Sequence, residues 1–494
     1  MLFSRSKNQC EVPNTFMFIK LDQQGSLFEQ LARALKREIL EGRFEANSDL
    51  PATRKLAETL GVSRNTVIAA YELLRSEQLV AAQAGYRTRV MNNTLAPPAR
   101  ASRTSIKAQS RFSARTRRLH SETLPGPKAA LQYDLWYGDA LTRPQLLASW
   151  RRKLVAASVW VGSRYPSAIG LPSLRSAIAK YLLRRRGVSC DPDDVVVVSG
   201  TQQAVSVVAR AVLDEGQSAV IEEPHYRLAR HTLLAHGARV TCVRVDSEGL
   251  VTAELPPRPP RLIFVTPSHQ FPSGAVLSLA RRLELLKYAA ASGCWIFEDD
   301  YDGEFQYGER PLPALRSLDV GERVIYSGSF SKTLFPGLRL GFIVCPTGLR
   351  NDLRMAKALE DLGCSSVDQA ALAAFLDSRQ YEKHLRKSLA ELRNRRQALL
   401  DGLSRNLQGE IDIADSSSGM HLVVWFRRLG YRGLDRLVAH ALERGLGIYP
   451  IRPFYQNPPP RPGLILGFAA QSPAQLQTAA ALLSSCLDQI RRTG

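Results

Sequence analysis

The run YSGSFSKTLFPGLRLGF spans Tyr326–Phe342 and places one lysine, Lys332, among aromatic and aliphatic residues. Phe330 and Leu334 lie within two positions of this lysine, and Arg339 follows seven residues later. An ammonium group in apolar surroundings costs free energy unless it becomes neutral or gains a partner. The amine is therefore expected either to pair with an acid or to form a covalent bond with a carbonyl compound.

A second motif, CWIFEDDYDGEF at 294–305, is an apolar run that ends in acidic residues. The pattern predicts a buried strand with Asp299 and Tyr301 at its C-terminal end, which is where open α/β sheets bind ligands. A carboxylate there can hold a protonated ring nitrogen, and a tyrosine can contact a ring hydroxyl. A metal site and a solvated acidic loop remain alternatives for this cluster.

A third motif, VVVVSGTQQAV at 195–205, has the order strand, small turn, helix. Backbone N–H groups at such a helix N-terminus bind phosphate, and an arginine can grip phosphate with two N–H bonds. Tyr226, in EEPHYRLAR at 222–230, offers a flat surface for a ring, although a tyrosine after a strand is often only a core residue. The candidate phosphate ligands are Gly200, Thr201, Gln202, Ser329, Ser331 and Arg339.

A lysine, a pyridine-facing acid, a phosphate cradle and a stacking ring are the four requirements of a pyridoxal 5'-phosphate (PLP) site. Each motif alone is weak, but their order along one chain is more specific. Buried-strand runs alternate with helical stretches between about residue 130 and residue 385, which predicts a mostly parallel sheet covered by helices. The tail, with KSLAELRNRRQALLDGL at 387–403 and later strands, predicts a smaller α+β lobe.

Residues 20–90 form a different unit. Apolar residues at helical spacing predict a helix from Leu27 to Gly42, and LPATRKLAETLG at 50–61 predicts a second, short helix. Ser63 is the predicted N-cap of a third helix, and AAQAGYRTRV at 81–90 predicts a two-stranded ribbon.

Two short helices joined by LGVS have the spacing of a helix-turn-helix, whose second helix enters the DNA major groove. Arginine suits guanine edges and asparagine suits adenine. A plain three-helix module with a polar surface is the alternative. The predicted DNA contacts are Arg54, Ser63, Arg64, Asn65, Thr66 and, in the ribbon, Gly85.

Charge and composition agree with this division. Residues 1–128 carry 21 Lys and Arg against 11 Asp and Glu, half of the net charge of +20, which favours a polyanionic partner. Residues 91–128 are rich in Pro, Ser and Arg without an apolar period, so we predict a flexible basic linker there. No run of apolar residues is long enough for a membrane span. The seven scattered cysteines predict free thiols in a reducing cytoplasm and no metal site.

The head resembles the winged helix-turn-helix domain of GntR-type regulators, through LGVSRNTVIAAYELLRSEQL at 60–79 and GYRTRV at 85–90. Residues 129–494 resemble the fold-type I PLP-dependent aminotransferases (class I/II). The resemblance implies that Lys332 forms the PLP aldimine. It implies the other cofactor contacts at Asp299, Tyr301, Tyr226 and the phosphate ligands, and it places Tyr165 near the phosphate of the opposite subunit.

The combination of head, linker and body resembles the MocR-type transcriptional regulators. It implies a homodimer that binds double-stranded promoter DNA and senses PLP, an amine or an amino acid. An active aminotransferase with an accessory head is the alternative, and a panel of amino donors and keto acceptors would separate the two. A regulator that has lost its cofactor is a third possibility, which the intact Lys332, Asp299 and Arg339 argue against.

Two positions depart from the aminotransferase pattern. In TPSHQFPSG at 266–274, Phe271 stands where those enzymes have an asparagine, so the ring-hydroxyl contact falls to His269 or Gln270. In LGFAAQS at 466–472, Ala470 stands where they have the arginine that holds the substrate carboxylate. Two substitutes for that arginine lie nearby, Arg452 and Arg461.

Overall fold

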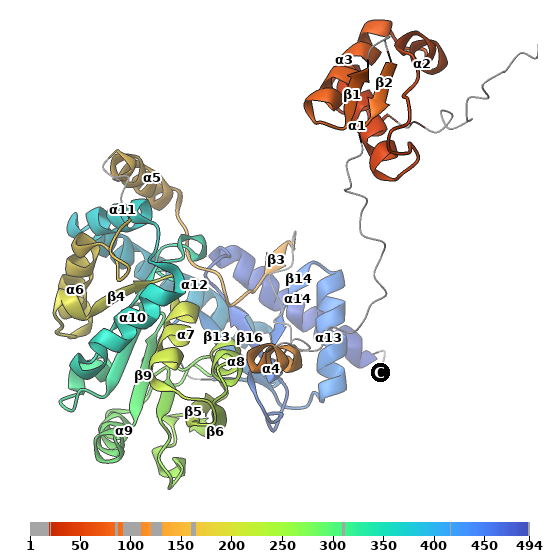
Figure 1. The fold of residues 1–494 in the computed structure, drawn as a ribbon. Coiled ribbons are helices and arrows are strands. Elements are labelled where there is room, and N and C mark those ends of the chain that lie inside the picture. Colours follow the sequence, from red (N-terminus) through yellow and green to blue (C-terminus); the bar gives the residue numbers. More distant parts are fainter. Residues whose placement is uncertain are drawn as a thin grey trace, which may run out of the picture. The chain divides into compact units, whose positions relative to one another are not determined.

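The computed structural model describes residues 19, 21–83, 87–91, 110–119, 131–159, 165–308, 312–414 and 416–492. The chain divides into two compact units, residues 1–107 and 108–494, called here the head and the body. Figure 1 shows the elements of each unit. Within the described residues, no helix is both long enough and apolar enough to span a membrane.

The head has the predicted elements: α1 (Leu27–Leu40), α2 (Thr53–Leu60), α3 (Arg64–Ser76), β1 (Val80–Gln83) and β2 (Arg87–Val90). The strands pair antiparallel, as the predicted ribbon requires. The helices bury their apolar faces against one another around residues such as Leu35, Leu56 and Val67.

The turn between α2 and α3 follows from its residues. Gly61 ends α2 in the left-handed conformation, which glycine adopts without steric cost. The Ser63 side chain then accepts a hydrogen bond from the Asn65 amide at 3.3 Å and caps α3. This short turn fixes the crossing of the two helices.

The body contains a large sheet of eight described strands in the order β4-β11-β10-β9-β8-β5-β6-β7. Strands β10, β9, β8, β5 and β6 pair in parallel, and β11 and β7 run antiparallel to their neighbours. The mostly parallel sheet is therefore confirmed. Its strands are β4 (Val195–Val198), β5 (Ser218–Glu223), β6 (Arg239–Asp246), β7 (Gly249–Leu250), β8 (Leu262–Val265), β9 (Trp295–Asp300), β10 (Val324–Ser329) and β11 (Gly341–Val344).

Helices cover both faces of this sheet, because alternate residues of one strand enter different cores. Val195 and Val197 of β4 pack into the core that includes α6 and α11, whereas Val196 and Val198 pack into the core that includes α7 and α10. The body helices are α4 (Arg111–Leu119), α5 (Pro144–Ser158), α6 (Pro172–Arg186), α7 (Thr201–Val212), α8 (Arg227–Ala235), α9 (Leu279–Ser292), α10 (Arg350–Asp361), α11 (Ser366–Asp377), α12 (Gln380–Asn406), α13 (Tyr431–Glu443) and α14 (Pro473–Arg492).

The predicted smaller lobe is a four-stranded sheet, β12-β13-β16-β15, with α12 and α14 packed against each other. Its strands are β12 (Ile411–Ile413), β13 (His421–Phe426), β15 (Tyr449–Pro450) and β16 (Gly463–Gly467). A short parallel pair, β3 (Tyr133–Asp134) and β14 (Leu446–Gly447), ties the start of the body to this lobe.

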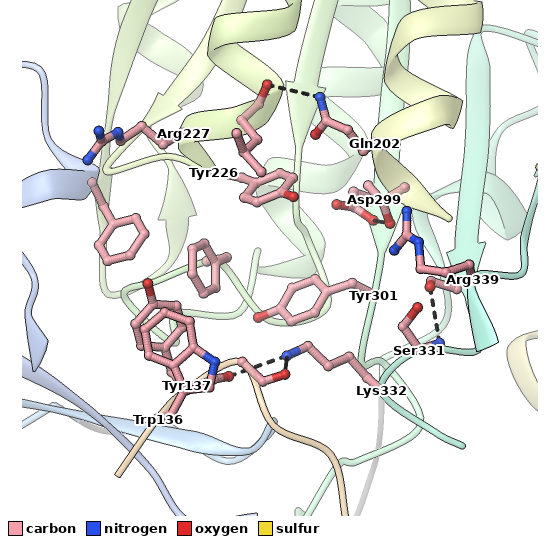
Figure 2. A pocket seen from close by; sticks show the side chains of 16 residues that line it. Trp136, Tyr137, Gln202, Tyr226, Arg227, Asp299, Tyr301, Ser331, Lys332 and Arg339 are labelled. Carbon is pink, nitrogen blue, oxygen red and sulfur yellow. Dashed lines mark hydrogen bonds between the residues drawn. The ribbon is translucent and has the colours of Figure 1, made fainter. Parts of the chain in front are cut away.

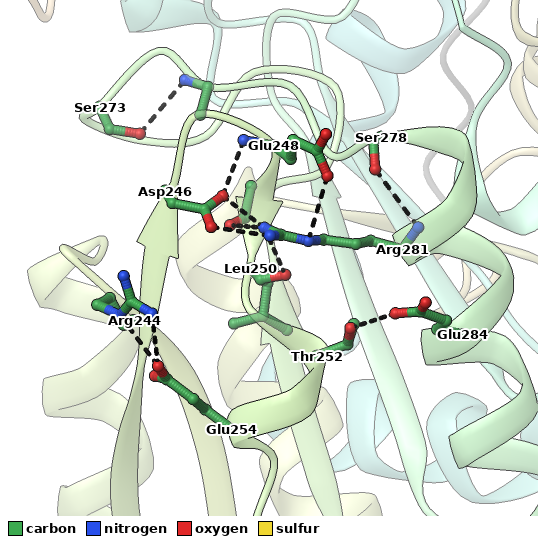
Figure 3. A network of polar contacts seen from close by, with 12 residues as sticks. Arg244, Asp246, Glu248, Leu250, Thr252, Glu254, Ser273, Ser278, Arg281 and Glu284 are labelled. Atoms are coloured by element: carbon green, nitrogen blue, oxygen red, sulfur yellow. Dashed lines mark hydrogen bonds and ion pairs between the residues drawn. The ribbon is translucent and has the colours of Figure 1, made fainter.

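Arg281 of α9 holds the β6–β7 hairpin at the edge of the large sheet (Figure 3). Its guanidinium donates to Asp246 Oδ1 at 2.5 Å and to the Gly249 carbonyl at 2.9 Å, and Arg244 pairs with Glu254 at 2.7 Å. These contacts fix the register of an edge strand whose outer side has no further β-partner in the described chain.

Helix α4 corrects the linker prediction, since residues 111–119 are helical and not irregular. Arg115 Nε donates to the Ala235 carbonyl at the end of α8 (2.8 Å), and Arg115 Nη1 pairs with Glu215 at 3.0 Å. Phe112 packs edge-on against His236 at 6.0 Å. The sequence hides this helix because tertiary contacts stabilise it without a buried apolar stripe. The linker residues 92–109 and 120–128 lie outside the described residues.

Candidate functional site

The body contains a cavity of about 300 Å3 at the C-terminal ends of the parallel strands (Figure 2). Two predicted cofactor contacts are absent from its lining, Gly200 and Tyr165, and Tyr165 is 89 % exposed. The cavity is lined by Trp136, Tyr137, Gly138, Thr201, Gln202, Tyr226, Arg227, Leu228, Phe271, Asp299, Tyr301, Ser329, Ser331, Lys332, Arg339 and Phe454. Gly200 lies next to this lining, as the N-cap of α7.

Lys332 enters the cavity from the turn that follows β10. Its Nζ donates to the Gly138 carbonyl at 2.6 Å and to the Tyr137 carbonyl at 3.3 Å (Figure 2). The amine therefore bonds to two backbone carbonyls in these contacts and does not pair with an acid. Desolvation lowers the pKa of the amine to about 8, against the opposite influence of Asp302 and Asp139. At this pKa roughly a tenth of the amine is neutral at pH 7, and the neutral amine is the form that attacks a carbonyl.

This lowered pKa predicts the pH dependence of covalent PLP capture by cofactor-free protein. Because the amine is neutral above its pKa, the rate should rise with pH and level off above about 8. An ordinary lysine, with a pKa of about 10.4, would still be gaining rate there. Stopped-flow absorbance measures the capture rate as a function of pH. Nα-acetyl-lysine in solution is the control, because it keeps a free side-chain amine and reports the titration of PLP itself. A profile that parallels the control would contradict the assigned environment.

The acidic residues of β9 point alternately to opposite faces of the sheet and therefore have two different roles. Glu298 and Asp300 are structural: Glu298 accepts the amides of Leu315 and Arg316, and Asp300 pairs with Arg186 at 2.7 Å. Asp299 instead faces the cavity. The three acidic residues are buried, which excludes a solvated acidic loop. Among the described residues, this motif does not form a group of side chains close enough together to hold a metal ion.

Asp299 lies in the cavity wall, where it accepts a hydrogen bond from Thr201 Oγ1 at 3.4 Å. Burial raises the pKa of its carboxyl well above the usual range, and the nearby Asp300 and Asp302 carboxylates raise it further. This carboxyl group would be ionised by a cation placed beside it, such as a protonated ring nitrogen.

The side chain of His269 contacts the Tyr301 hydroxyl on the side away from the cavity. The Tyr301 hydroxyl lies 2.9 Å from His269 Nδ1, which also lies 2.8 Å from Asp302 Oδ2. Neither His269 nor Gln270 lines the cavity, and Gln270 Nε2 bonds to Glu222 and to the Pro224 carbonyl. Of the two candidates for the missing asparagine contact, His269 therefore acts only through Tyr301, and Gln270 is directed elsewhere.

Glycine and arginine form a compact cradle at the other side of the cavity. A Cβ on Gly200 would lie 3.2 Å from both terminal nitrogens of Arg339, so glycine lets this guanidinium approach. Arg339 Nη2 donates to the Ser199 carbonyl at 2.5 Å. The first helical bonds of α7 come from the Gln203 and Ala204 amides, leaving the Thr201 and Gln202 amides ahead of the ladder at its positive end.

The Gln202 side chain lies toward α8, where its amide donates to Thr232 and Leu228. Tyr226, at the N-cap of the same helix, presents its ring to the cavity. Burial raises the pKa of Tyr226 to about 12, so its hydroxyl stays neutral. Phe271 contacts the Tyr226 and Tyr301 rings edge-on at 6.0 Å, and so makes an apolar wall.

Part of the cavity lining was not predicted from the sequence. Trp136, Tyr137 and Gly138 follow β3 and close the cavity near Lys332, and Phe454 comes from the small lobe. An aromatic pair directly before a glycine, outside any periodic stretch, was the available signal. Arg227 was also missed; Figure 2 shows it across the cavity from Arg339.

The two suggested substitutes for the carboxylate-binding arginine do not reach the cavity. Arg452 lies over the Tyr431 ring at 5.3 Å, and Arg461 pairs with Asp412. Ala470 is exposed and does not line the cavity. Among the described lining residues, Arg227 is the one arginine besides Arg339.

Four of the six predicted recognition residues of the head are exposed to solvent. Arg54 lies exposed in the first turn of α2, and Ser63, Arg64 and Asn65 lie exposed at the start of α3. Thr66 is partly buried, and Gly85 lies outside the described residues. In the ribbon, Arg87 and Arg89 both pair with Asp49, at 3.1 and 3.0 Å, which reduces the charge they offer to a polyanion.

Both the head and the body are similar to known protein families. Residues 27–90 match the model of the bacterial regulatory proteins of the gntR family, and residues 143–483 match aminotransferase class I and II. The probable rhizopine catabolism regulatory protein MocR of Rhizobium meliloti is 34% identical over 96% of this chain and 96% of its own length. The chain belongs to the MocR-type transcriptional regulators.

Other relatives agree with this assignment. The HTH-type transcriptional regulator TauR of Rhodobacter capsulatus is 32% identical over 90% of this chain and 93% of its own. Among solved structures, the α-aminoadipate aminotransferase LysN of Thermus thermophilus superposes with a TM-score of 0.66 and 26% identity. The match covers 78% of this chain and 97% of that one. This protein is thus a DNA-binding transcriptional regulator whose body has the PLP-binding aminotransferase fold.

Proposed function

We propose that the regulator binds PLP covalently at Lys332 and that an amino compound reacting there changes how the head binds promoter DNA. The carrying observation is the position of the Lys332 amine, desolvated in a cavity that also contains Asp299 and the Arg339 cradle. The naming of the relatives as regulators favours this function over a working aminotransferase.

The residues of the cavity fit PLP. The glycine-lined cradle and the α7 N-terminus suit a phosphate, Asp299 suits a protonated ring nitrogen, and Tyr226 offers a ring face. The structure of LysN contains N-(5'-phosphopyridoxyl)-L-leucine, which supports the same use of the fold here. When bound, PLP supplies an electrophilic carbon that reacts reversibly with amines. The chain itself would orient the ring, neutralise its charges and exclude water.

We propose that α8 and α4 carry the response toward the head. Tyr226 and Arg227, at the start of α8, line the cavity, while the end of α8 contacts α4 through Ala235 and His236. In the sequence, α4 precedes the rest of the body and follows the segment that leads from the head. A ligand that shifts α8 would therefore alter the anchorage of that segment.

Arg115→Ala tests this route. We expect it to leave PLP binding and ligand-free DNA binding unchanged, and to reduce several-fold the effect of ligand on DNA affinity. The reason is that it removes two contacts of α4 with the rest of the body. Arg118→Ala is the matched control, since Arg118 is exposed on the same helix. Fluorescence anisotropy of promoter DNA, with and without ligand, measures the coupling; equal responses of both variants and the wild type would contradict the route.

We further propose a homodimer in which the partner's Tyr165 completes the phosphate end of the cavity. Val155 and Val159 near the end of α5 are 68 % and 75 % exposed, and Tyr165 is 89 % exposed, which is unusual for such residues unless a partner covers them. Sedimentation at micromolar chain concentration should give a dimer, and Tyr165→Phe should weaken PLP affinity without changing that mass. A monomer, or unchanged affinity in the variant, would contradict the arrangement.

A further inference from the structure

Three donor side chains of different chemistry converge beside the cavity but outside its lining. Glu223, His225 and Cys242 offer an oxygen, a nitrogen and a sulfur that all lie within 4.8 Å of one another. We propose that these residues bind a divalent transition metal ion of the Zn²⁺ class. The site is independent of the proposed PLP chemistry, and the scattered cysteines of the sequence had predicted no metal site.

The sheet explains why residues distant in sequence meet here. In the parallel pair β5–β6, Ile221 lies opposite Cys242, and Glu223, two positions later, projects on the same side as Ile221. His225 follows β5 directly and is 2 % exposed. Glu223 and His225 are two positions apart, but Cys242 follows 17 residues later on another strand, so the three residues do not form a recognisable short metal motif.

The three donor atoms, which all lie within 4.8 Å of one another, would draw closer together around a metal ion. His225 Nδ1 lies 3.1 Å from Glu223 Oε2, and Cys242 Sγ lies 3.1 Å from Gln456 Oε1. Donor atoms around a tetrahedral zinc with bonds of 2.0–2.3 Å are roughly 3.3–3.8 Å apart. Gln456 Oε1 or a water molecule would provide the fourth ligand.

The donor set selects the class of metal. A thiolate and an imidazole favour Zn²⁺, Co²⁺ and Ni²⁺ over Mg²⁺ and Ca²⁺, which prefer oxygen. One carboxylate and one thiolate balance the charge of a divalent ion. Without a metal, burial raises the pKa of the Cys242 thiol to about 12, so the metal would release its proton on binding.

The site lies where the two lobes of the body meet. Glu223 Oε1 accepts the amides of Gln456 and Asn457 at 2.6 and 3.2 Å, and the His225 amide donates to the Phe454 carbonyl at 2.9 Å. Tyr226, next to His225, and Phe454 both line the cavity. A metal here would therefore hold the loop before α8 against the small lobe and stiffen one wall of the cavity.

The test uses full-length protein titrated with Zn²⁺ in a calorimeter and with Co²⁺ in an absorbance cell. We expect one ion per chain and a Co²⁺–thiolate charge-transfer band. Cys242→Ser should abolish that band and weaken Zn²⁺ binding at least 10–100-fold, the loss that even outer-shell partners cause. His225→Ala should weaken binding similarly. Cys190→Ser, at another partly buried free thiol, is the matched control and should change neither readout.

Three results would overturn the site: no binding to the wild type, no thiolate band with Co²⁺, or equal affinity in Cys242→Ser. A second readout is the rate at which PLP leaves the protein, which should fall several-fold in the presence of Zn²⁺ in the wild type but not in Cys242→Ser. A rate that ignores Zn²⁺ would overturn the stiffening of the wall. Failure of PLP to bind at all would contradict the proposed function and leave the Zn²⁺ and Co²⁺ titrations as the decisive measurements.

Discussion

Lys332→Ala will remove covalent PLP binding completely. Wild-type protein incubated with PLP should absorb in the visible range and, after borohydride reduction, retain the cofactor on the peptide that contains Lys332. The variant should show neither property, because no other described lysine lines the cavity. Absorbance spectra and mass spectrometry of the digested protein measure the two effects.

Two controls separate chemistry from folding. Lys332→Arg keeps a positive charge near the Tyr137 and Gly138 carbonyls but cannot form the covalent bond, so it should behave like Lys332→Ala in both assays. Lys180→Ala, at an exposed position on α6, should behave like the wild type. A reduced adduct that persists in Lys332→Ala at one-to-one stoichiometry would show that PLP binds through another amine.

Arg64→Ala will cost specific DNA affinity about 1–3 kcal/mol, because a guanidinium at the start of a recognition helix reads guanine edges with two hydrogen bonds. Arg64 is exposed in the first turn of α3, directly after the Ser63 cap. The loss should be larger on the cognate promoter than on unrelated DNA. Anisotropy titrations on both duplexes, at several salt concentrations, measure the difference.

Arg75→Ala is the matched control, since it removes the same charge from the exposed C-terminal end of α3. It should lower affinity slightly and equally for both duplexes, as a general electrostatic effect does. If Arg64→Ala and Arg75→Ala lose the same affinity on both duplexes, then α3 does not read bases through its N-terminal end.

Much of the fold was predictable because its residues carry local information. Strand β4 is a continuous apolar run, β9 begins with three apolar residues, and α2 and α3 are delimited by Gly61 and Ser63. Strand β6 was not predicted, because only the two-residue strand β7 pairs with its outer side and its mixed sequence RVTCVRVD has no continuous apolar run. Helix α4 was hidden for a related reason, because its stability comes from contacts with residues that are distant in sequence.

The site residues, too, were predictable only where one segment carries the signal. Lys332, Asp299 and Arg339 belong to sequence motifs that each indicate a chemical role, and the structure brings them into one cavity. The aromatic wall of Tyr137, Phe271 and Phe454 comes from three separate segments, and only their packing brings these rings together. Arg227 was missed because an arginine at the start of a helix is usually a surface residue.

The most direct test of the central claim is the affinity of the wild type and of Lys332→Ala for promoter DNA, with PLP alone and with PLP plus a panel of amines and amino acids. We expect at least one of these ligands to change the DNA affinity of the wild type several-fold, and Lys332→Ala to bind the same DNA without responding. A variant that responds like the wild type would contradict the claim that the Lys332 cavity controls the head.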